Sequence, residues 1–271
     1  MKAAAFGYVK PRTLQDALGV LAQHGEAARV LAGGQSLIPS LNMRLSAPEV
    51  LVDISALPLK EIRLERGVLR LGALVTHAQI ERSAEIAKHA PLLAQAVKHI
   101  AHPAIRNRGT LGGSLALADP AAEYPACALA LAASIVLVSR QGERSVAAKD
   151  FFKGLFETDL RPGELVAALE VPAQGASERS AFVELARRHG DYAIVGLAAF
   201  KGRETRFAFL NVGSTPVLAA KAASKKTLAE AKEALKTDLS PVADLYNSAA
   251  TKLHLAGVLL ERAWNTLSTS R

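Results

Sequence analysis

The segment from Arg106 to Pro125 reads Arg-Asn-Arg-Gly-Thr-Leu-Gly-Gly-Ser-Leu-Ala-Leu-Ala-Asp-Pro-Ala-Ala-Glu-Tyr-Pro. It lies between two runs with helical patterning, yet it holds three glycines, a free Thr and Ser, and an Asp-Pro break. Glycines this close together let backbone N–H groups approach a large anion, whereas a structural loop normally needs only one or two. We therefore expect this segment to close over the pyrophosphate of a dinucleotide.

A second glycine segment, Ala32-Gly33-Gly34-Gln35-Ser36, follows an apolar strand expected over residues 28–32. Residues 37–45 can continue as a helix or a turn, and this order leaves N–H groups unpaired where the turn meets the helix. We expect this segment to hold the other side of the same diphosphate. The hydroxyl groups of Ser36, Thr110 and Ser114 would add donors.

The common nucleotide-binding and hydrolase motifs are missing. Gly-x-Gly-x-x-Gly does not follow the first strand, and P-loop, Gly-x-Ser-x-Gly and His-Glu-x-x-His patterns do not occur, which argues against those classes of site. The two glycine segments remain as candidate phosphate-binding loops, although two unrelated turns would have the same composition. Arg106 and Arg108 either add positive charge near the expected phosphates or belong to a solvated face.

Length and composition describe a folded soluble protein with two or three subdomains. The chain has 271 residues, of which 50% are hydrophobic and 21% charged. No run reaches the roughly 18 apolar residues of a membrane span, and the amino terminus lacks the apolar segment of a secretory signal, so we expect a cytoplasmic location. The net charge of +8 is spread along the chain with few aromatic residues, which argues against nucleic acid as a partner.

Cysteine and histidine usage argues against a metal site in this chain. Cys127 is the only cysteine, which excludes an internal disulfide and any cluster or zinc site that takes four cysteines from this chain. We expect Cys127 to be a core thiol. His89, His99 and His102 lack a converging carboxylate or second ligand, so we expect structural or solvated histidines and no metal.

The order of expected elements indicates an α+β fold. Strands are expected over residues 181–186, 193–200 and 206–212, and helices over residues 219–235 and 241–267. Strands followed by helices, instead of strict alternation, are typical of an α+β domain. The polar, glycine-containing stretch 173–180 precedes these strands and marks a boundary.

The glycine segments, with three further stretches, resemble a known family. Ala32 to Ser36, Ile105 to Ser114, Asp119 to Pro125, Arg187 to Ala193 and Lys252 to Ala256 occur in order from end to end. Together they are similar to the signatures of the FAD-binding medium subunit of molybdenum hydroxylases, the family of carbon monoxide dehydrogenase and xanthine dehydrogenase. The resemblance implies an FAD-binding domain of the vanillyl-alcohol oxidase type with two lobes, 1–55 and 56–175. A small α+β domain with an antiparallel sheet and helices would cover 176–271.

The resemblance also implies partners. A large molybdopterin subunit would hydroxylate the substrate, and a small subunit with two [2Fe-2S] clusters would pass electrons on to FAD in this chain. The flavin would then discharge them to an acceptor. The complex would be a dimer of heterotrimers, and the single cysteine agrees with clusters that reside in a partner. Two alternatives are a cofactor-free scaffold subunit and a stand-alone flavin oxidase. Neither the substrate nor the acceptor, whether NAD, a quinone, oxygen or a cytochrome, follows from the sequence.

Carried over residue by residue, the resemblance implies the positions that contact FAD. Asp191 and Tyr192 would lie beside the isoalloxazine, Val166 would pack near it, and Glu123 stands where relatives often have Asp. No catalytic acid or base is expected, because electron flow through the flavin needs none. The implied cofactor contacts are Ala32, Gly33, Gly34, Gln35, Ser36, Leu37, Thr110, Gly112, Gly113, Ser114, Glu123, Val166, Asp191 and Tyr192.

Overall fold

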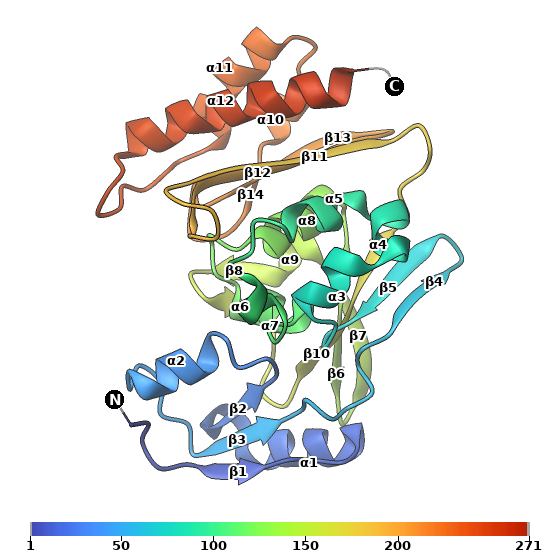
Figure 1. The fold of residues 1–271 in the computed structure, drawn as a ribbon, viewed down its shortest axis with the longest axis vertical. Coiled ribbons are helices and arrows are strands. Elements are labelled where there is room, and N and C mark those ends of the chain that lie inside the picture. The colour runs from blue at the N-terminus through green and yellow to red at the C-terminus, as the bar shows by residue number, and fades with distance from the viewer. Residues whose placement is uncertain (1, 270–271) are drawn as a thin grey trace.

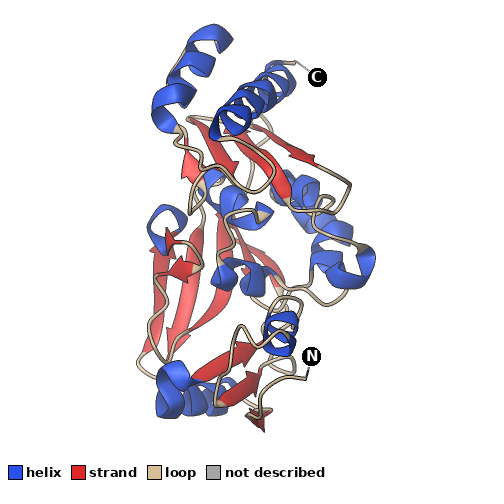
Figure 2. Ribbon diagram, turned by 90° about the vertical axis from the view of Figure 1, so that its left-hand side faces the viewer, coloured by secondary structure: helices blue, strands red, loops and turns tan. Residues whose placement is uncertain are grey.

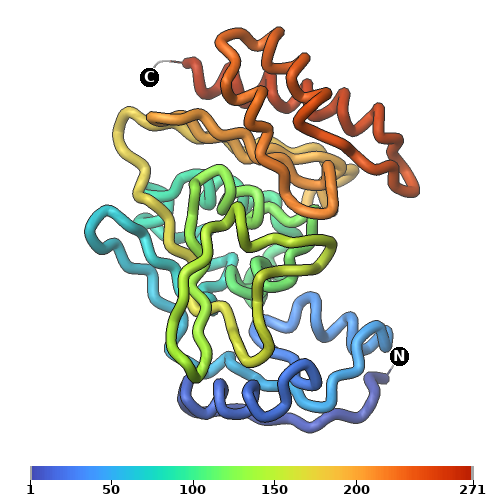
Figure 3. Tube along the Cα trace, turned by 180° about the vertical axis from the view of Figure 1, so that it is seen from behind, coloured from blue at the N-terminus to red at the C-terminus, as the bar shows by residue number. Residues whose placement is uncertain are grey.

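The structure is a computed structural model that describes residues 2–269, and it has the expected α+β architecture. Three sheets of three or more strands follow one another along the length of the molecule (Figure 1). The two ends of the described chain lie at opposite ends of the molecule (Figure 3). None of the helices within residues 2–269 is both long and apolar enough to cross a membrane.

The amino-terminal sheet is parallel and packs on one helix. Its strands, in spatial order, are β1 (Gly7–Val9), β3 (Val50–Asp53) and β2 (Ala28–Leu31). Helix α1 (Leu14–His24) begins after Thr13, whose side chain accepts a hydrogen bond from the Asp16 N–H, and ends at Gly25 with φ of 51°. The N-cap residue Thr13 and the C-terminal Gly25 make the bounds of this helix predictable from sequence. A 3₁₀ turn, η1 (Gly25–Ala27), leads into β2.

The central sheet is antiparallel and carries helices on one side (Figure 2). In spatial order its strands are β4 (Ile62–Glu65), β5 (Val68–Gly72), β10 (Leu165–Pro172), β6 (Ser134–Ser139) and β7 (Gly142–Ala147). The helices between β5 and β6 are α3 (His77–Arg82), α4 (Ala84–His89), α5 (Pro91–Ala96), α6 (Pro103–Arg106), α7 (Leu111–Leu117) and α8 (Glu123–Ala130). After β7 come α9 (Ala148–Phe151) and the short pair β8 (Phe152–Gly154) and β9 (Glu157–Thr158).

The carboxy-terminal sheet lies between two layers of helices (Figure 1). Its strands, in spatial and chain order, are β11 (Arg179–Ala186), β12 (Ala193–Lys201), β13 (Thr205–Leu210) and β14 (Val217–Leu218). The helices that follow are α10 (Ala220–Ala223), α11 (Leu228–Asp238) and α12 (Ala249–Ser268). Side chains alternate along β12, so that Ala198 and Phe200 join the core with α8 while Leu197 and Ala199 join the core with α12.

The two long helices expected at the carboxy terminus are broken in the structure. Residues 219–235 divide into α10 and α11, because Thr227 and Glu230 form a capping box that starts a new helix. Residues 241–248 are not helical. There Asp244 Oδ1 accepts hydrogen bonds from the N–H groups of Tyr246 and Asn247, and Ser248 caps α12, so local side-chain bonds outcompete the helix.

Candidate functional site

A cleft of about 780 Å³ opens between the amino-terminal sheet, helices α7 and α8, and the turn that precedes β12. Its volume lies in the upper part of the range of roughly 300–1,000 Å³ that is usual for small-molecule and cofactor sites. The structure brings all the expected cofactor contacts to its walls. They are Ala32, Gly33, Gly34, Gln35, Ser36, Leu37, Thr110, Gly112, Gly113, Ser114, Glu123, Val166, Asp191 and Tyr192.

The loop between β2 and α2 (Leu37–Asn42) offers unpaired backbone donors to this cleft. The N–H groups of Gly33, Gly34, Gln35 and Ser36 donate to no protein acceptor within residues 2–269. Gly34 adopts φ of 73°, a conformation that favours glycine. Successive free N–H groups in such a turn form a concave site for an anion, so this loop has the donors expected of it.

In the segment from Arg106 to Pro125 the paired glycines belong to helix α7, and the first N–H groups of this helix are already bonded. Thr110 caps α7, and its Oγ1 accepts from the Gly113 N–H at 3.2 Å. The Leu111 N–H donates to the Val75 carbonyl at 2.9 Å, and the Gly112 N–H donates to the Ala73 carbonyl at 2.8 Å. Our expectation that this segment supplies free N–H donors is therefore wrong. The acceptors come from residues just after β5, which the local sequence does not reveal.

Three of the glycines allow close packing, Gly33 against the other glycine segment and Gly109 and Gly112 against residues 73–77. A Cβ atom on Gly33 would lie 2.1 Å from the Arg108 carbonyl oxygen, and one on Gly112 would lie 2.4 Å from the Ala73 Cβ. A Cβ on Gly109 would lie 2.6 Å from His77 Nε2. Gly113 differs, because it is exposed and a Cβ there would approach only the Thr110 hydroxyl, at 2.9 Å, among the described atoms. Gly113 thus faces the open cleft.

The arginines that flank the glycines do not reach the cleft. Arg106 is buried, and it donates to Glu81 and to the carbonyl groups of Ile100 and Ala101, so it has a structural role. Arg108 lines an adjoining cavity of about 430 Å³ together with Gly33, Gly34 and Gln35. Arg108 thus lies beside a glycine loop, as expected, whereas Arg106 does not.

Two other arginines, Arg29 and Arg161, line the cleft instead. An isolated arginine carries no positional signal, so Arg29 could not be selected from sequence. Arg161 precedes Pro162 and Gly163, and this turn composition could have marked a loop. His77 also lines the cleft, but burial and then the charge of Arg106 lower its pKa to about 4, so it is neutral at physiological pH.

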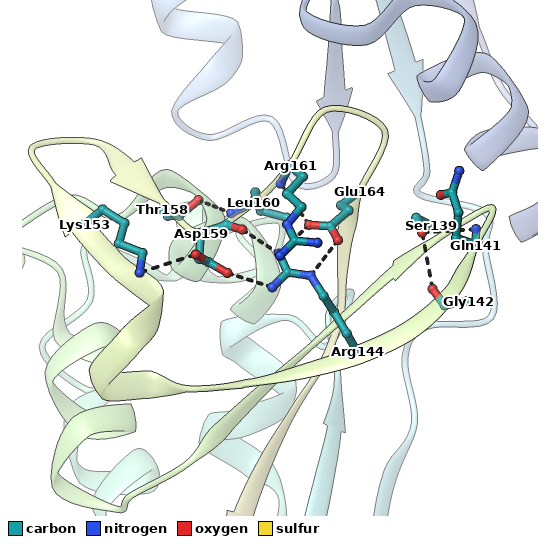
Figure 4. Close-up of polar contacts among 10 residues, drawn as sticks. All are labelled: Ser139, Gln141, Gly142, Arg144, Lys153, Thr158, Asp159, Leu160, Arg161 and Glu164. Carbon is teal, nitrogen blue, oxygen red and sulfur yellow. Dashed lines mark hydrogen bonds and ion pairs between the residues drawn. The ribbon is translucent and has the colours of Figure 1, made fainter.

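The loop that carries Arg161 is held in place by Arg144 on β7 (Figure 4). The Arg144 guanidinium binds both carboxylate oxygens of Glu164, at 2.6 and 2.7 Å, and donates to the carboxylate and the carbonyl oxygen of Asp159, at 2.7 and 2.6 Å. A bidentate arginine pair adds geometric specificity as well as energy. The network therefore fixes one wall of the cleft.

We expect Arg144→Met to lower the thermal unfolding temperature, because it leaves the carboxylates of Glu164 and Asp159 without their partner. Losing one partner of a hydrogen-bonded charge pair costs about 2 kcal/mol, which corresponds to about 5 °C for a chain of this size. Arg144→Lys should recover only part of this loss, since an ammonium cannot bind a carboxylate through a planar fork. Thermal melts followed by circular dichroism would measure the unfolding temperature of both variants. An equal unfolding temperature for Arg144→Met and the unchanged protein would contradict the stabilising role of Arg144.

The opposite wall is acidic and aromatic. Glu123, the first residue of α8, is only 8% exposed, and Asp119 lies in the turn before it. Tyr192 is 74% exposed and follows Gly190, whose φ of 84° lets the turn pack against the Ala101 carbonyl. An exposed aromatic side chain on the wall of a cofactor cleft can stack on a planar ring system.

Comparison with known proteins agrees with this geometry. Residues 4–174 match the FAD binding domain in molybdopterin dehydrogenase, and residues 180–267 match the CO dehydrogenase flavoprotein C-terminal domain. The fold and the cleft thus define the chain as a flavoprotein component of an oxidoreductase, with FAD as its cofactor. More particularly, the chain belongs to the family of FAD-binding medium subunits of molybdenum hydroxylases.

Individual relatives cover almost the whole chain. The 6-hydroxypseudooxynicotine dehydrogenase complex subunit alpha of Paenarthrobacter nicotinovorans is 40% identical over 97% of this chain and 94% of its own. The carbon monoxide dehydrogenase medium chain of Hydrogenophaga pseudoflava is 34% identical over 96% of each chain. Among solved structures, quinoline 2-oxidoreductase from Pseudomonas putida 86 aligns with a TM-score of 0.90 and 38% identity over 98% of both chains.

Proposed function

We propose that the chain binds FAD in this cleft and transfers electrons within a heterotrimeric molybdenum hydroxylase. Electrons would arrive from the [2Fe-2S] clusters of a small partner subunit and leave to an external acceptor. A large molybdopterin subunit would hydroxylate the substrate, and two heterotrimers would form the complex in the cytoplasm. The observation that carries the proposal is the row of unpaired N–H groups at Gly33 to Ser36, which faces a cleft of cofactor size.

Each wall of the cleft has a part in this proposal. The Gly33 to Ser36 loop would donate to the pyrophosphate, with Arg29 and Arg161 offsetting part of its charge. The exposed face of α7 at Gly113 and Ser114 would border the dinucleotide. Tyr192 would cover the isoalloxazine, and Val166, which is buried and lines the cleft, would pack beside it.

FAD, when bound, supplies the redox chemistry, while the protein supplies binding, orientation and exclusion of water. No side chain needs to move a proton for outer electron transfer, so the proposal names no catalytic acid or base. We infer that residues 1–55 and 56–175 form the two lobes around the cofactor. Residues 176–271 would form the unit that closes the cleft with Asp191 and Tyr192.

Gly113→Val separates cofactor binding from folding. We expect this variant to fold and to lose FAD, because its side chain would project into the space of the pyrophosphate while meeting only the Thr110 hydroxyl within the protein. The measurement is flavin absorbance that remains with the protein after gel filtration, together with a thermal melt. Gly257→Val, the same change on α12 where a Cβ has no described atom within 4 Å, is the matched control.

The same experiment tests the alternatives. A cofactor-free scaffold would co-purify with its partners, stay colourless, and assemble equally well with Val at residue 113. A stand-alone oxidase would bind FAD and reduce oxygen with a substrate in the absence of any partner. Identification of the chains that co-purify with the tagged full-length protein distinguishes these cases, and a folded complex without flavin would overturn the proposal.

A further inference from the structure

A buried lysine on α12 lies outside the cleft and has no part in the cofactor contacts described so far. Lys252 is only 4% exposed. Its ammonium group pairs with the Asp244 carboxylate at 2.9 Å and donates to the Asn211 carbonyl oxygen at 3.4 Å. Burying an ammonium group carries a desolvation penalty that a surface ion pair avoids, so this position needs an explanation.

The acceptor, Asn211, lies in the turn after β13 and joins three segments of the chain. Its side-chain amide donates to the carbonyl groups of Ala193 and Ile194, at 2.6 and 3.2 Å. Its N–H donates to the Pro120 carbonyl at 2.8 Å, and its own carbonyl accepts from Lys252. Asn211 adopts φ of 57°, which asparagine tolerates better than most residues. One residue thus links β12, the turn before α8, and α12.

Two of these three segments are walls of the cleft. Ala193 directly follows Tyr192, Pro120 directly precedes Ala121, and Tyr192 and Ala121 both line the cleft. The bonds from Asn211 go to backbone carbonyl groups of both walls, so they fix the path of the chain. Asn211 therefore sets the separation of the two turns that face each other across this part of the cleft.

The turn that carries Tyr192 is also held at its start. Arg187 Cζ lies 4.7 Å from the centre of the Tyr246 ring, a distance at which a guanidinium is attracted to the ring face. The Tyr246 N–H donates to Asp244 Oδ1 at 2.8 Å, while Asp244 Oδ2 pairs with Lys252. Asp244 thereby connects the contact at the start of the turn with the contacts at its end.

We propose that Asn211 is a positioning residue for the flavin, and that the ion pair of Lys252 with Asp244 keeps Asn211 in place. Asn211 would hold the Tyr192 turn at a fixed distance from the turn before α8, so that the Tyr192 ring stays over the isoalloxazine. Residues of a functional site must be held to within about 0.5 Å by the groups behind them. Neither Asn211 nor Lys252 lines the cleft, so both act through the backbone of its walls. The proposal rests on the FAD site described under the proposed function.

Asn211→Gly tests this role directly. Glycine keeps the positive φ, the N–H group and the carbonyl, and it removes only the amide that bonds Ala193 and Ile194. The tagged full-length protein is purified with the chains that accompany it, and the fluorescence of its bound flavin is measured. The fluorescence should rise severalfold in Asn211→Gly, because an aromatic ring stacked on a flavin quenches its emission. Equal fluorescence in Asn211→Gly and the unchanged protein would overturn the proposal.

Variants of Lys252 test the second part of the proposal. Lys252→Met should raise the flavin fluorescence in the same way, whereas Lys252→Arg keeps a charged donor and should restore the quenching. Lys232→Met is the matched control, because it removes an ion pair between α11 and α12, that of Lys232 with Glu261, and should leave the fluorescence unchanged. Thermal melts identify the variants that fold. Asn211→Gly keeps the backbone conformation, so it decides the question if Lys252→Met fails to fold.

A double variant shows whether Asn211 acts through Tyr192. Tyr192→Leu alone should raise the flavin fluorescence at least as much as Asn211→Gly does. Adding Asn211→Gly to Tyr192→Leu should raise it no further, because residues that act as one unit do not have additive effects. A second, additive rise would show that Asn211 has a merely structural role and would overturn the positioning of Tyr192.

Hydrogen exchange in the FAD-free chain gives a measurement that needs no cofactor. The Asp191 N–H donates to the Arg188 carbonyl at 3.1 Å, and the Ala122 N–H donates to the Asp119 carbonyl at 3.0 Å. Both amides should exchange up to about tenfold faster in Asn211→Gly, the equivalent of one lost hydrogen bond, and at the same rate in Lys232→Met. Unchanged exchange in Asn211→Gly would overturn the proposal. Absence of flavin from the unchanged complex would instead overturn the proposed function.

Discussion

Replacing Gly33 with alanine should lower the thermal unfolding temperature by about 10 °C and abolish FAD binding. The added Cβ would lie 2.1 Å from the Arg108 carbonyl oxygen, 2.8 Å from its carbon and 2.9 Å from the Gly109 Cα. All three are backbone atoms, so one loop must move away from the other. Overpacking of this kind costs about 3 kcal/mol, which for a chain of this length is about 10 °C.

The matched control is Gly19→Ala in helix α1, where a Cβ would have no described atom within 4 Å. Alanine in a helix interior is more favourable than glycine by about 1 kcal/mol, so this variant should melt at or above the unchanged protein. Melting curves and retained flavin absorbance would be measured on both. If Gly33→Ala unfolds at the same temperature as the unchanged protein, the two glycine segments are not packed as described.

The comparison of Gly33 with Gly112 and Gly113 shows what the sequence could and could not predict. A dense glycine run indicates close approach of backbone, and the structure confirms this at Gly33 and Gly112. Which atoms lie against each glycine depends on the tertiary structure. At Gly33 and Gly112 they belong to another segment of the same chain, and Gly113 faces the open cleft. The same residue type therefore has two roles within one motif.

Local signals predicted the elements that carry their own caps and turns. Thr13 and Gly25 bound α1, Thr76 begins α3, and Gly67 forms the turn between β4 and β5, and each of these residues is a cap or turn signal that can be seen in the sequence. Expectations that depended on distant partners were less reliable. The N–H groups of α7 are bonded to residues 73 and 75, and Arg106 is bonded to Glu81, and neither pairing leaves a trace in the local pattern.

That residues far apart in the chain meet in one complete site could be predicted from the family resemblance, but not from physical chemistry alone. Ser36, Ser114 and Tyr192 are far apart in the chain, yet they line one cleft. Composition could propose the two glycine loops as the two sides of one anion site, but only the resemblance added Tyr192 to that site before the structure did. Arg29 and Arg161 were missed, because single charged residues outside a motif have no signal of their own.

Glu123→Gln should stabilise the FAD-free protein at pH 8 by a few kcal/mol. The folded-state pKa of Glu123 is about 8, above its usual 4.5, so the folded state binds this proton more tightly than the unfolded state. Its contribution to stability is complete below about pH 4.5 and is lost as the pH rises toward 8. Glutamine stays neutral, so the variant avoids this loss. Each pKa unit corresponds to about 1.4 kcal/mol.

The measurement is the free energy of unfolding in urea at pH 5 and pH 8 for both proteins. His77 has the opposite dependence, because its lowered pKa of about 4 makes stability fall as the pH drops below its usual 6.5. That contribution is the same in both proteins and cancels in their difference. The difference should therefore be small at pH 5 and large at pH 8, while Glu49→Gln, at an exposed residue away from the cleft, should show no such change. A difference that is equal at both pH values would mean that Glu123 is ionised in the folded chain, and that the acidic wall of the cleft is solvated.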